Sequence, residues 1–352
     1  MKELCSRKVE VIVLAPQDQT SHRWEELGAR YLNLSLDRKS TNPLSDLRLL
    51  RLLWNIYKQE HPDMVMHFTI KPVIFGSIAA RQANVKRVYN MIPGLGYVFS
   101  GNRLTQLALR PLVRKLYKIA LKNSHMVFFQ NIEDKNYFEQ YSLVNKDKTR
   151  ITLGSGVDLE HFYYVEPEIK EEKCTFLLLA RMISDKGINE FVEAARLIRE
   201  DNHTAYFQIL GKIDKGNPNH IKDEYIEMWK KEKIVTLLEE KDDVRSVIAH
   251  ADVVVLPSYY REGVPKSLLE AMAMGKAIIT TNVPGCKETV IEGINGFLIP
   301  PRDIMALVES IRFMITHPRQ RADMGKQSRK IAVDRFDVKK VNSIIIEAMD
   351  IR

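Results

Sequence analysis

The chain has 352 residues, of which 45% are apolar and 28% charged, and its formal net charge is +8. This length predicts two domains, and the balance of apolar and charged residues excludes a fibrous or disordered chain. No run approaches the ~20 apolar residues that cross a bilayer. Three scattered cysteines provide neither a zinc spacing nor a disulfide framework, so we expect a cytoplasmic protein.

The basic excess lies in the first half of the chain. Residues 1–165 carry 24 basic and 15 acidic side chains, against 29 and 30 in the rest. Between Asp63 and Glu133 there is no acidic residue, although ten basic ones occur there. Coulomb attraction therefore predicts an anionic partner for this half. A nucleic acid is not expected, because few aromatic residues alternate with the basic ones and no recognition module matches.

Strands and helices alternate through the first half. The elements expected there are, in order, a strand at 9–15, a helix at 44–60, a strand at 63–68, a helix at 72–83, strands at 87–92 and 126–130, and a helix at 133–141. Residues 1–7 have the pattern of a helix end that leads directly into the strand at 9–15. Doubly wound domains usually open with a strand and a glycine-rich turn, so we expect this domain to lack its first strand.

The second half repeats the alternation. The elements expected there are, in order, a strand at 175–180, a helix at 187–201, strands at 206–210 and 252–256, a helix at 266–274 and a strand at 277–281. Such alternation indicates an α/β protein with parallel sheets covered by helices. The charged segment 162–173 lacks a clear period and contains a proline, which makes it the candidate linker between the two halves.

Two cations flank the turn that follows the strand at 175–180. Arg181 and Lys186 stand five residues apart, and Gly187 opens the next helix. Open α/β sheets bind ligands at the carboxyl ends of their strands, and a guanidinium together with an ammonium suits a diphosphate. Taken alone, a turn of this kind is more often an ordinary solvated turn with surface charges.

A sharper pattern lies at 262–270, between the strand at 252–256 and a helix. Gly263 lets the backbone approach a ligand closely, and free N–H groups at a helix start attract an anion. Glu262 can reach a sugar hydroxyl, while Glu270, one turn further in, can accept hydrogen bonds from ribose hydroxyls. The alternative is a capped helix whose two glutamates are solvated.

Together, the Arg-x4-Lys-Gly motif at 181–187 and the Glu-x7-Glu motif at 262–270 resemble the donor site of family-4 glycosyltransferases, which have the GT-B fold. Further matches follow in the family's order at 154–158, Gly211 and 295–298. The resemblance extends from residue 9 onward. It implies two doubly wound, Rossmann-like domains that face a cleft.

The linker and the resemblance together give a division of the chain. We expect an N-terminal acceptor- and membrane-facing domain at 1–165 and a nucleotide-sugar-binding domain at 166–335. The resemblance implies that residues 336–352 form a helix that crosses back to the N-terminal domain.

The resemblance also implies roles for individual residues. Arg181 and Lys186 neutralise the diphosphate and stabilise the leaving nucleotide, Glu262 holds the transferred sugar, and Glu270 binds ribose. Glu262, Arg181 and Lys186 are the catalytic candidates. The donor-binding residues implied are Arg181, Lys186, Gly211, Glu262, Gly263, Val264, Pro265, Lys266, Ser267, Leu268 and Glu270.

The reaction implied is sugar transfer with retained anomeric configuration, by attack on the front face of the donor. We expect no metal, since the family needs none and the chain contains no Asp-x-Asp motif. No cofactor is expected beyond the UDP-sugar that serves as donor substrate.

Two loops of the first half, 67–72 and 93–99, follow predicted strands. Their sequences resemble those of a bacterial subgroup of the family. Members of that subgroup use UDP-sugars to extend polyprenyl-diphosphate-linked saccharides for surface polysaccharides or protein glycosylation. The acceptor-binding residues expected are Lys71, Gly94, Gly96 and Arg103. Taken alone, the glycine pair indicates only a tight loop. His67 is one position away from the family's histidine, so we expect a strand histidine without a catalytic role.

The segment 103–122 predicts a basic amphipathic helix. At 100° per residue, its basic residues fall within about two fifths of the circumference. The apolar residues expected on the opposite side of the helix are Leu109, Leu112, Val113, Leu116, Ile119 and Ala120. Such a helix suits an anionic membrane surface, and a core-packed helix with a solvated basic face is the open alternative. With membrane binding, the protein would lie peripherally on the inner face of the cell membrane.

The function predicted is therefore a retaining, metal-independent glycosyltransferase that moves a sugar from a nucleotide diphosphate to a lipid-linked saccharide. A nucleotide-sugar epimerase of similar architecture is one alternative. An inactive sugar-nucleotide-binding remnant is the other, because the N-terminal domain is expected to lack its first strand.

Overall fold

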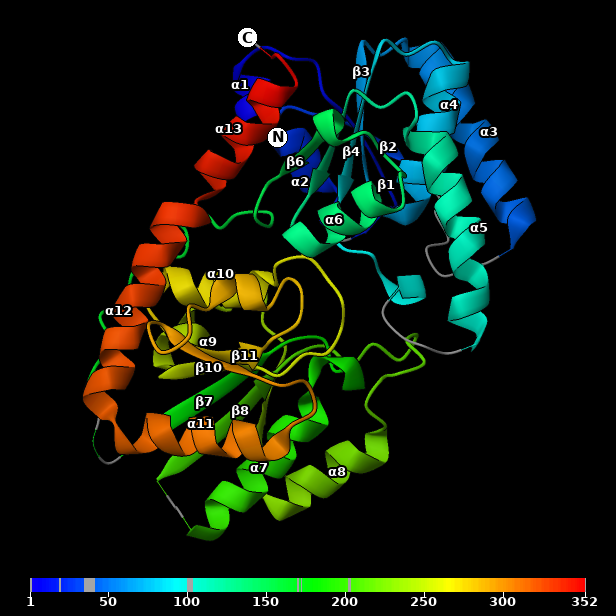
Figure 1. Cartoon of the computed structure of the whole chain (residues 1–352). Coiled ribbons are helices and arrows are strands. Elements are labelled where there is room, and N and C mark those ends of the chain that lie inside the picture. Colours follow the sequence, from blue (N-terminus) through cyan, green and yellow to red (C-terminus); the bar gives the residue numbers. More distant parts are fainter. Residues whose placement is uncertain are drawn as a thin grey trace.

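The computed structural model describes residues 2–18, 20–34, 42–99, 104–169, 171, 173–201 and 204–351. Two lobes stand one above the other, each built from parallel strands with helices around them (Figure 1). The upper lobe in this view contains the N-terminal strands, and the lower lobe contains the remaining ones. The α/β architecture with two Rossmann-like lobes is thus confirmed.

The N-terminal lobe contains two parallel sheets. Its strands are β1 (Ile12–Ala15), β2 (Arg30–Asn33), β3 (Met64–Phe68), β4 (Arg87–Ile92), β5 (Met126–Phe129) and β6 (Thr149–Ile151). Strand β1 pairs with β2, and the other four follow the order β3-β4-β5-β6. The predicted strands are present, although β1 is shorter than expected. Strands β2 and β6 are missed because they are short and carry a charged residue, Arg30 or Arg150.

Helices of the N-terminal lobe are mostly where periodicity predicts them. They are α1 (Lys2–Ser6), α2 (His22–Glu26), α3 (Pro43–Glu60), α4 (Ser77–Gln82), α5 (Leu104–Leu121) and α6 (Ile132–Gln140). The helix predicted at 72–83 begins as a π-helical turn, η1 (Pro72–Gly76), ahead of α4. The buried His67 ring occupies the place where a side chain on Gly76 would stand, so a glycine at this position leaves room for the histidine.

The C-terminal lobe is one six-stranded sheet in the order β12-β11-β10-β7-β8-β9. The strands are β7 (Cys174–Leu179), β8 (Ala205–Leu210), β9 (Thr236–Leu238), β10 (Val253–Leu256), β11 (Ala277–Thr281) and β12 (Gly296–Ile299). Central strands β7 and β10 are buried on both faces, which explains their nearly continuous apolar sequences. On β7, Phe176 packs into the core on one face and Leu177 into the core on the other.

Helices cover both faces of this sheet. They are α7 (Ile188–Asp201), α8 (Asp223–Glu232), α9 (Arg245–His250), α10 (Lys266–Ala273), α11 (Ile304–Thr316) and α12 (Pro318–Arg335). The strand order runs outward in opposite directions from β7 and β10, so the switch point of the sheet lies between them. Ligands of open α/β sheets bind beyond the carboxyl ends of the strands at such a point. The loops that follow β7 and β10 are therefore the expected position of a ligand-binding site.

The last helix, α13 (Val338–Ala348), packs against the N-terminal lobe. Figure 1 shows α12 and α13 running along one side of both lobes. Arg87 Nη1 donates to the carbonyl oxygen of Met349 at 3.1 Å, and Met349 joins Tyr89 and Phe128 in a buried cluster. Val157, which lies between the two lobes in sequence, exchanges backbone hydrogen bonds with Phe336 and Val338. The chain therefore passes between the lobes along two adjacent segments.

Candidate active site

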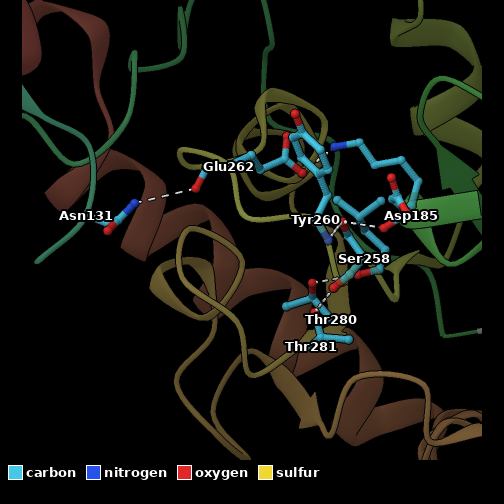
Figure 2. A network of polar contacts seen from close by, with 9 residues as sticks. Asn131, Asp185, Ser258, Tyr260, Glu262, Thr280 and Thr281 are labelled. Atoms are coloured by element: carbon cyan, nitrogen blue, oxygen red, sulfur yellow. Dashed lines mark hydrogen bonds and ion pairs between the residues drawn. The ribbon is translucent and has the colours of Figure 1, made fainter. Parts of the chain in front are cut away.

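The loops after β7 and β10 meet at the switch point and bring two predicted residues together. Lys186 Nζ forms an ion pair with Glu262 Oε1, and only 8% of the Lys186 side chain is exposed. The loops are held together by hydrogen bonds from Tyr259 N and Ser258 Oγ to the Asp185 carbonyl oxygen, at 3.0 and 3.2 Å. Figure 2 shows Asp185, Ser258 and Glu262 within this network of contacts.

Gly187 is required where these loops cross. Its φ of +75° is in the left-handed region, and a side chain there would collide with the carbonyl oxygen of Pro257. A residue with a Cβ would push the loops apart and separate Lys186 from Glu262. This explains locally why glycine follows the lysine.

Arg181 stands at the start of the same turn and is more exposed. Its Nη1 lies 3.1 Å from Asp214 Oδ2, and 56% of its side chain is accessible to solvent. Asp214 follows β8, whose exit at Gly211 packs so closely on Ala180 that a Cβ would collide with that carbonyl oxygen. Gly211 thus acts through backbone packing, and Asp214 is a contact that the sequence did not indicate.

The start of α10 presents backbone donors. Its N-cap is Pro265, and no side chain caps the helix. Within the described part of the chain, the N–H groups of Lys266 and Ser267 donate no hydrogen bond. Unpaired amides at a helix start attract an anion, as predicted for this segment. Val264 and Leu268 are buried, so their side chains anchor the turn while the backbone faces outward.

Glu270 lies in the second turn of α10 and is partly buried. Burial raises the pKa of Glu270 to about 7, and the nearby Lys266 ammonium opposes this rise. The pKa of Tyr260 responds to charges on both loops of the site. Burial raises its pKa, the Glu262 carboxylate raises it further, and the Arg181 guanidinium lowers it. This mutual influence indicates that Arg181, Tyr260 and Glu262 share one electrostatic environment.

The N-terminal lobe contacts this loop through a glycine. A Cβ on Gly94 would stand 2.8 to 2.9 Å from backbone atoms of Glu262 and Gly263. In turn, a Cβ on Gly263 would collide with the side chain of Gln130 and the carbonyl oxygen of Pro93. Gly94 therefore lies at the junction of the lobes, against the loop at 257–265, which we call the donor loop after the role that the sequence predicts for it. Gly96 has a φ of +68° and lies near Ile70.

Lys71 is less free than its acid-free surroundings suggest. Its Nζ lies 2.8 Å from Asp46 Oδ1, and Asp46 belongs to α3, ahead of that stretch in sequence. An anionic ligand would meet this ion pair rather than an isolated ammonium. Arg103, the fourth predicted acceptor residue, lies outside the described residues.

His67 is a buried strand residue. Its Nε2 lies 2.9 Å from the Tyr57 hydroxyl and its Nδ1 lies 3.0 Å from Asn90 Oδ1. Burial lowers the pKa of His67 to about 4, although the hydrogen bond to Asn90 opposes this. A ring that stays neutral and bonded on both nitrogens connects α3 to β4.

Helix α5 is amphipathic, and its predicted apolar face is divided between the core and the surface. Leu109, Leu112 and Ile119 are exposed. The helix packs on η1 and η2 (Tyr97–Phe99) along another stripe. Its buried residues are Gln106, Tyr117, Ala120 and Leu121. Val113 and Leu116 pack partly against the same core.

Two arginines of the predicted basic face are engaged within the lobe. Arg110 Nε donates to the Val98 carbonyl oxygen at 3.1 Å, and Arg114 Nε donates to the Tyr137 hydroxyl at 2.8 Å. The outer surface of α5 therefore combines lysines with exposed leucine and isoleucine. Among the described residues, no helix has both the length and the apolar character needed to cross a bilayer, and no three His, Cys, Asp or Glu gather as metal ligands.

Sequence reasoning missed several residues that surround the donor loop. They are Asn131, Asp134, Asp214, Tyr260, Arg261 and Gly285. Tyr260 and Arg261 immediately precede Glu262, so their place in the loop was a usable signal. The other four come from loops or a helix start far away in sequence, and their types are ordinary for such positions.

Two family models match the chain. Residues 163–331 match "Glycosyl transferases group 1", and residues 1–131 match "Glycosyl transferase 4-like". Between them, the two models span both lobes of the structure.

Curated relatives match over most of their length. The N,N'-diacetylbacillosaminyl-diphospho-undecaprenol alpha-1,3-N-acetylgalactosaminyltransferase of Campylobacter jejuni is 28% identical over 344 residues, which cover 95% of this chain and 89% of the relative. An Escherichia coli UDP-Gal:alpha-D-GlcNAc-diphosphoundecaprenol alpha-1,3-galactosyltransferase is 29% identical, with 86% and 79% covered.

Solved structures share the fold at lower identity. The sucrose-phosphate synthase of Thermosynechococcus elongatus superposes with a TM-score of 0.82 at 20% identity, covering 99% of this chain and 90% of that one. Anabaena HepE in complex with UDP gives 0.77 at 18% identity, with 97% and 100% covered. These structures show the GT-B fold, while the two family models and the curated relatives show that the chain is a glycosyltransferase.

Proposed function

We propose that this enzyme is a retaining glycosyltransferase that moves a sugar from a UDP-sugar to a polyprenyl-diphosphate-linked saccharide in bacterial surface polysaccharide or glycan biosynthesis. The Lys186–Glu262 ion pair at the switch point, with its buried lysine, carries this proposal, because it joins a cation for phosphate to a carboxylate for sugar. Both named relatives act on diphospho-undecaprenol-linked sugars, and HepE was crystallised with UDP.

The donor diphosphate would lie between the turn that carries Arg181 and Lys186 and the uncapped start of α10. As the bond from the anomeric carbon to the diphosphate breaks, negative charge grows on the leaving phosphate oxygen. Lys186, Arg181 and the free amides of α10 stabilise that charge, and they are in place beforehand. Preorganised donors of this kind do not have to be reoriented by the reaction.

Glu262 and Glu270 would hold the two sugars of the donor. When the diphosphate takes over the Lys186 ammonium, the Glu262 carboxylate is released to accept a hydrogen bond from a hydroxyl of the transferred sugar. Glu270 accepts hydrogen bonds from the ribose hydroxyls. The acceptor hydroxyl attacks from the face that the diphosphate leaves, and its proton passes to the departing phosphate oxygen.

The acceptor would approach from the N-terminal lobe. Gly94 touches the donor loop, and Lys71 with its partner Asp46 is the ionic group proposed to meet the acceptor diphosphate. The outer face of α5 exposes Leu112 and Ile119. Apolar and basic residues on one helix suit an anionic membrane surface. We place the enzyme peripherally on the inner face of the cell membrane.

Substitution of Lys186 tests the assignment. The purified chain is incubated with UDP-sugars and a short-chain polyprenyl-diphosphate-linked saccharide, and the product is measured by mass spectrometry. Removing the ammonium in Lys186→Ala should lower kcat/KM by about 100- to 1000-fold, the usual cost of losing one preorganised donor. Lys230→Ala, on the exposed side of α8, should retain full activity.

Other outcomes contradict the proposal in distinguishable ways. Wild-type turnover by Lys186→Ala would remove the lysine from the mechanism. Isomerised nucleotide sugar formed without acceptor would show an epimerase. Tight binding of UDP by calorimetry, with no product on any acceptor, would show a binding protein without transferase activity.

A further inference from the structure

The first turn of α6 in the N-terminal lobe holds two cations of the C-terminal lobe. The Asp134 side chain is fully buried, and its Oδ1 accepts from Arg261 Nε at 3.0 Å and lies 2.9 Å from Arg261 Nη2. Glu133 forms an ion pair with Lys287 in the loop after β11. Acids at a helix start usually interact only with the helix dipole, whereas this pair also binds the opposite lobe.

Asn131 connects this turn to the donor loop itself. It is the N-cap of α6, and its Oδ1 accepts from Asp134 N at 2.8 Å. Its Nδ2 donates to Asp134 Oδ2 at 3.0 Å and to the Glu262 carbonyl oxygen at 3.5 Å, a contact drawn in Figure 2. Asn131 is also fully buried. The backbone around Glu262 is therefore held on both sides, by the Arg261 side chain and by the Glu262 carbonyl group.

Close backbone contact accompanies the ion pair. Gly94 and Gly263 meet without any side chain between them, and a Cβ on Gly285 would collide with the carbonyl oxygens of Glu262 and Gly263. The loop at 261–263 is thus enclosed by the N-terminal lobe and by the loop after β11. A buried carboxylate is tolerated only while it is paired. The Asp134–Arg261 pair therefore favours the arrangement in which the lobes touch.

We propose that Asn131, Asp134 and Arg261 form a latch between the two lobes, and that this latch positions Glu262 for sugar transfer. The inference rests on the proposed role of Glu262 at the transferred sugar. Asp134 and Arg261 are positioning residues, since they act on the donor only through the loop they hold. Displacement of a reacting group by about 1 Å can cost about 100-fold in rate, which sets the scale expected for an open latch.

The test removes each charge: Asp134→Asn keeps the size of the side chain, and Arg261→Gln keeps a polar but shorter one. Asp134→Asn and Arg261→Gln are made singly and together, and kcat, donor KM and UDP affinity are measured. Each single variant should lower kcat by about 30- to 100-fold, with donor KM and the UDP Kd within about threefold of wild type. The double variant should lose no more than either single one, because both substitutions break the same pair.

Glu139→Gln provides the matched control. Glu139 lies on the same helix and is ion-paired with Lys135, but that pair stays within one lobe. The control should keep the wild-type kcat. Thermal unfolding of all variants, compared with the control, reports on folding. Additive losses in the double variant, an unchanged kcat, or a fall in UDP affinity as large as that in kcat would each overturn the latch.

A distance measurement tests the latch without any turnover. Spin labels at Lys146→Cys in the N-terminal lobe and Lys231→Cys in the C-terminal lobe, both exposed positions, report the separation of the lobes. With UDP bound, the wild-type distribution should be narrow, and Asp134→Asn should broaden it toward longer distances. An unchanged distribution overturns the latch. This readout is valid even if every acceptor fails, so the two proposals can fail separately.

Discussion

Among the residues of the proposed donor site, two charges are paired with each other before any donor binds. Lys186 is nearly inaccessible, and Glu262 is its partner. A buried charge is tolerated where it is paired, and each of these two charges is the partner of the other. A diphosphate can replace Glu262 as the partner of the lysine, which leaves the carboxylate free for the sugar. Glu270 differs because its carboxyl group is partly buried and its nearby cation, Lys266, only moderates the effect.

Donor affinity should depend on the ionisation of Glu270. Burial raises its pKa to about 7, so the ionised acceptor of ribose hydroxyls is present above that pH and lost below it. Between pH 8 and pH 6, the UDP affinity of wild type should weaken by about five- to tenfold more than the UDP affinity of Glu270→Gln. This range follows because a single titrating group contributes at most tenfold per pH unit. Isothermal titration calorimetry across this range measures the difference.

The same shift has a consequence for stability without ligand. Because the folded pKa is raised, Glu270 stabilises the fold fully below its ordinary value of 4.5, and this contribution is lost as pH rises to about 7. At pH 8, Glu270→Gln should therefore unfold at a higher temperature than wild type while binding UDP more weakly. If the UDP affinities of wild type and Glu270→Gln changed equally with pH, Glu270 would have no role in binding ribose.

Among the elements of the fold, loops and helix starts rather than strands make the contacts between the two lobes. The strands place Lys186 and Glu262 at the switch point, but glycines decide how closely the loops approach. Gly94 illustrates this, since it belongs to a loop of one lobe and touches the backbone of the donor loop of the other. The first turn of α6 is a second example, because its acids Glu133 and Asp134 form ion pairs with residues of the other lobe.

Gly94→Ala should impair turnover far more than folding. The added Cβ would stand 2.8 to 2.9 Å from the backbone of Glu262 and Gly263, so the lobes would have to separate by a few tenths of an ångström. We expect kcat to fall at least tenfold, with the midpoint of thermal unfolding within about 3 °C of wild type. Steady-state kinetics and calorimetric unfolding measure the two effects.

Gly293→Ala is the comparison for this substitution. Gly293 has a φ of +71°, so alanine is strained there, but nothing lies within 4 Å of the new Cβ. That variant should lose some stability while retaining turnover. If Gly94→Ala were as active as Gly293→Ala, the contact between the lobes would be unimportant for transfer.

At the scale of the whole molecule, the two lobes present different surfaces. The C-terminal lobe carries the Lys186–Glu262 ion pair, while α3 and α5 lie along the outer edge of the N-terminal lobe (Figure 1). Leu44 and Leu47 of α3 and Leu112 of α5 are exposed there. The lysines of α5, such as Lys118, are exposed as well. This edge therefore exposes both apolar and basic side chains, as the proposed membrane contact requires.

Charge reversal on α5 should release the enzyme from anionic vesicles. Lys118→Glu combined with Lys122→Glu should lower partitioning onto phosphatidylglycerol-containing vesicles at least about 30-fold, since each lysine near such a surface contributes about 1 kcal/mol. Lys230→Glu with Lys231→Glu on α8 reverses the same charge on the other lobe and should change partitioning little. Flotation assays measure the partitioning of both double variants. An equal loss of vesicle binding in the two would refute a specific role of the α5 face in membrane contact.

The donor motifs illustrate how much of the site can be predicted from sequence. Strand periodicity and the spacing of Arg181, Lys186, Glu262 and Glu270 predict the fold and a diphosphate site, because these residues follow directly from neighbouring strands of one sheet. Contacts between lobes could not be predicted. Asp134 has the sequence context of any acid at a helix start, and Asp214 that of any loop aspartate.

Local order along the chain is sufficient to predict the α/β alternation, the α10 start with its glycine and glutamates, and the basic character of the first half. The ion pairs Lys186–Glu262 and Lys71–Asp46 and the exposure of Leu112 appear only in the folded chain. The reason is that burial and ion pairing depend on which distant surfaces meet. These two pairs form where segments of the same lobe pack together, and the Asp134–Arg261 pair forms where the two lobes meet.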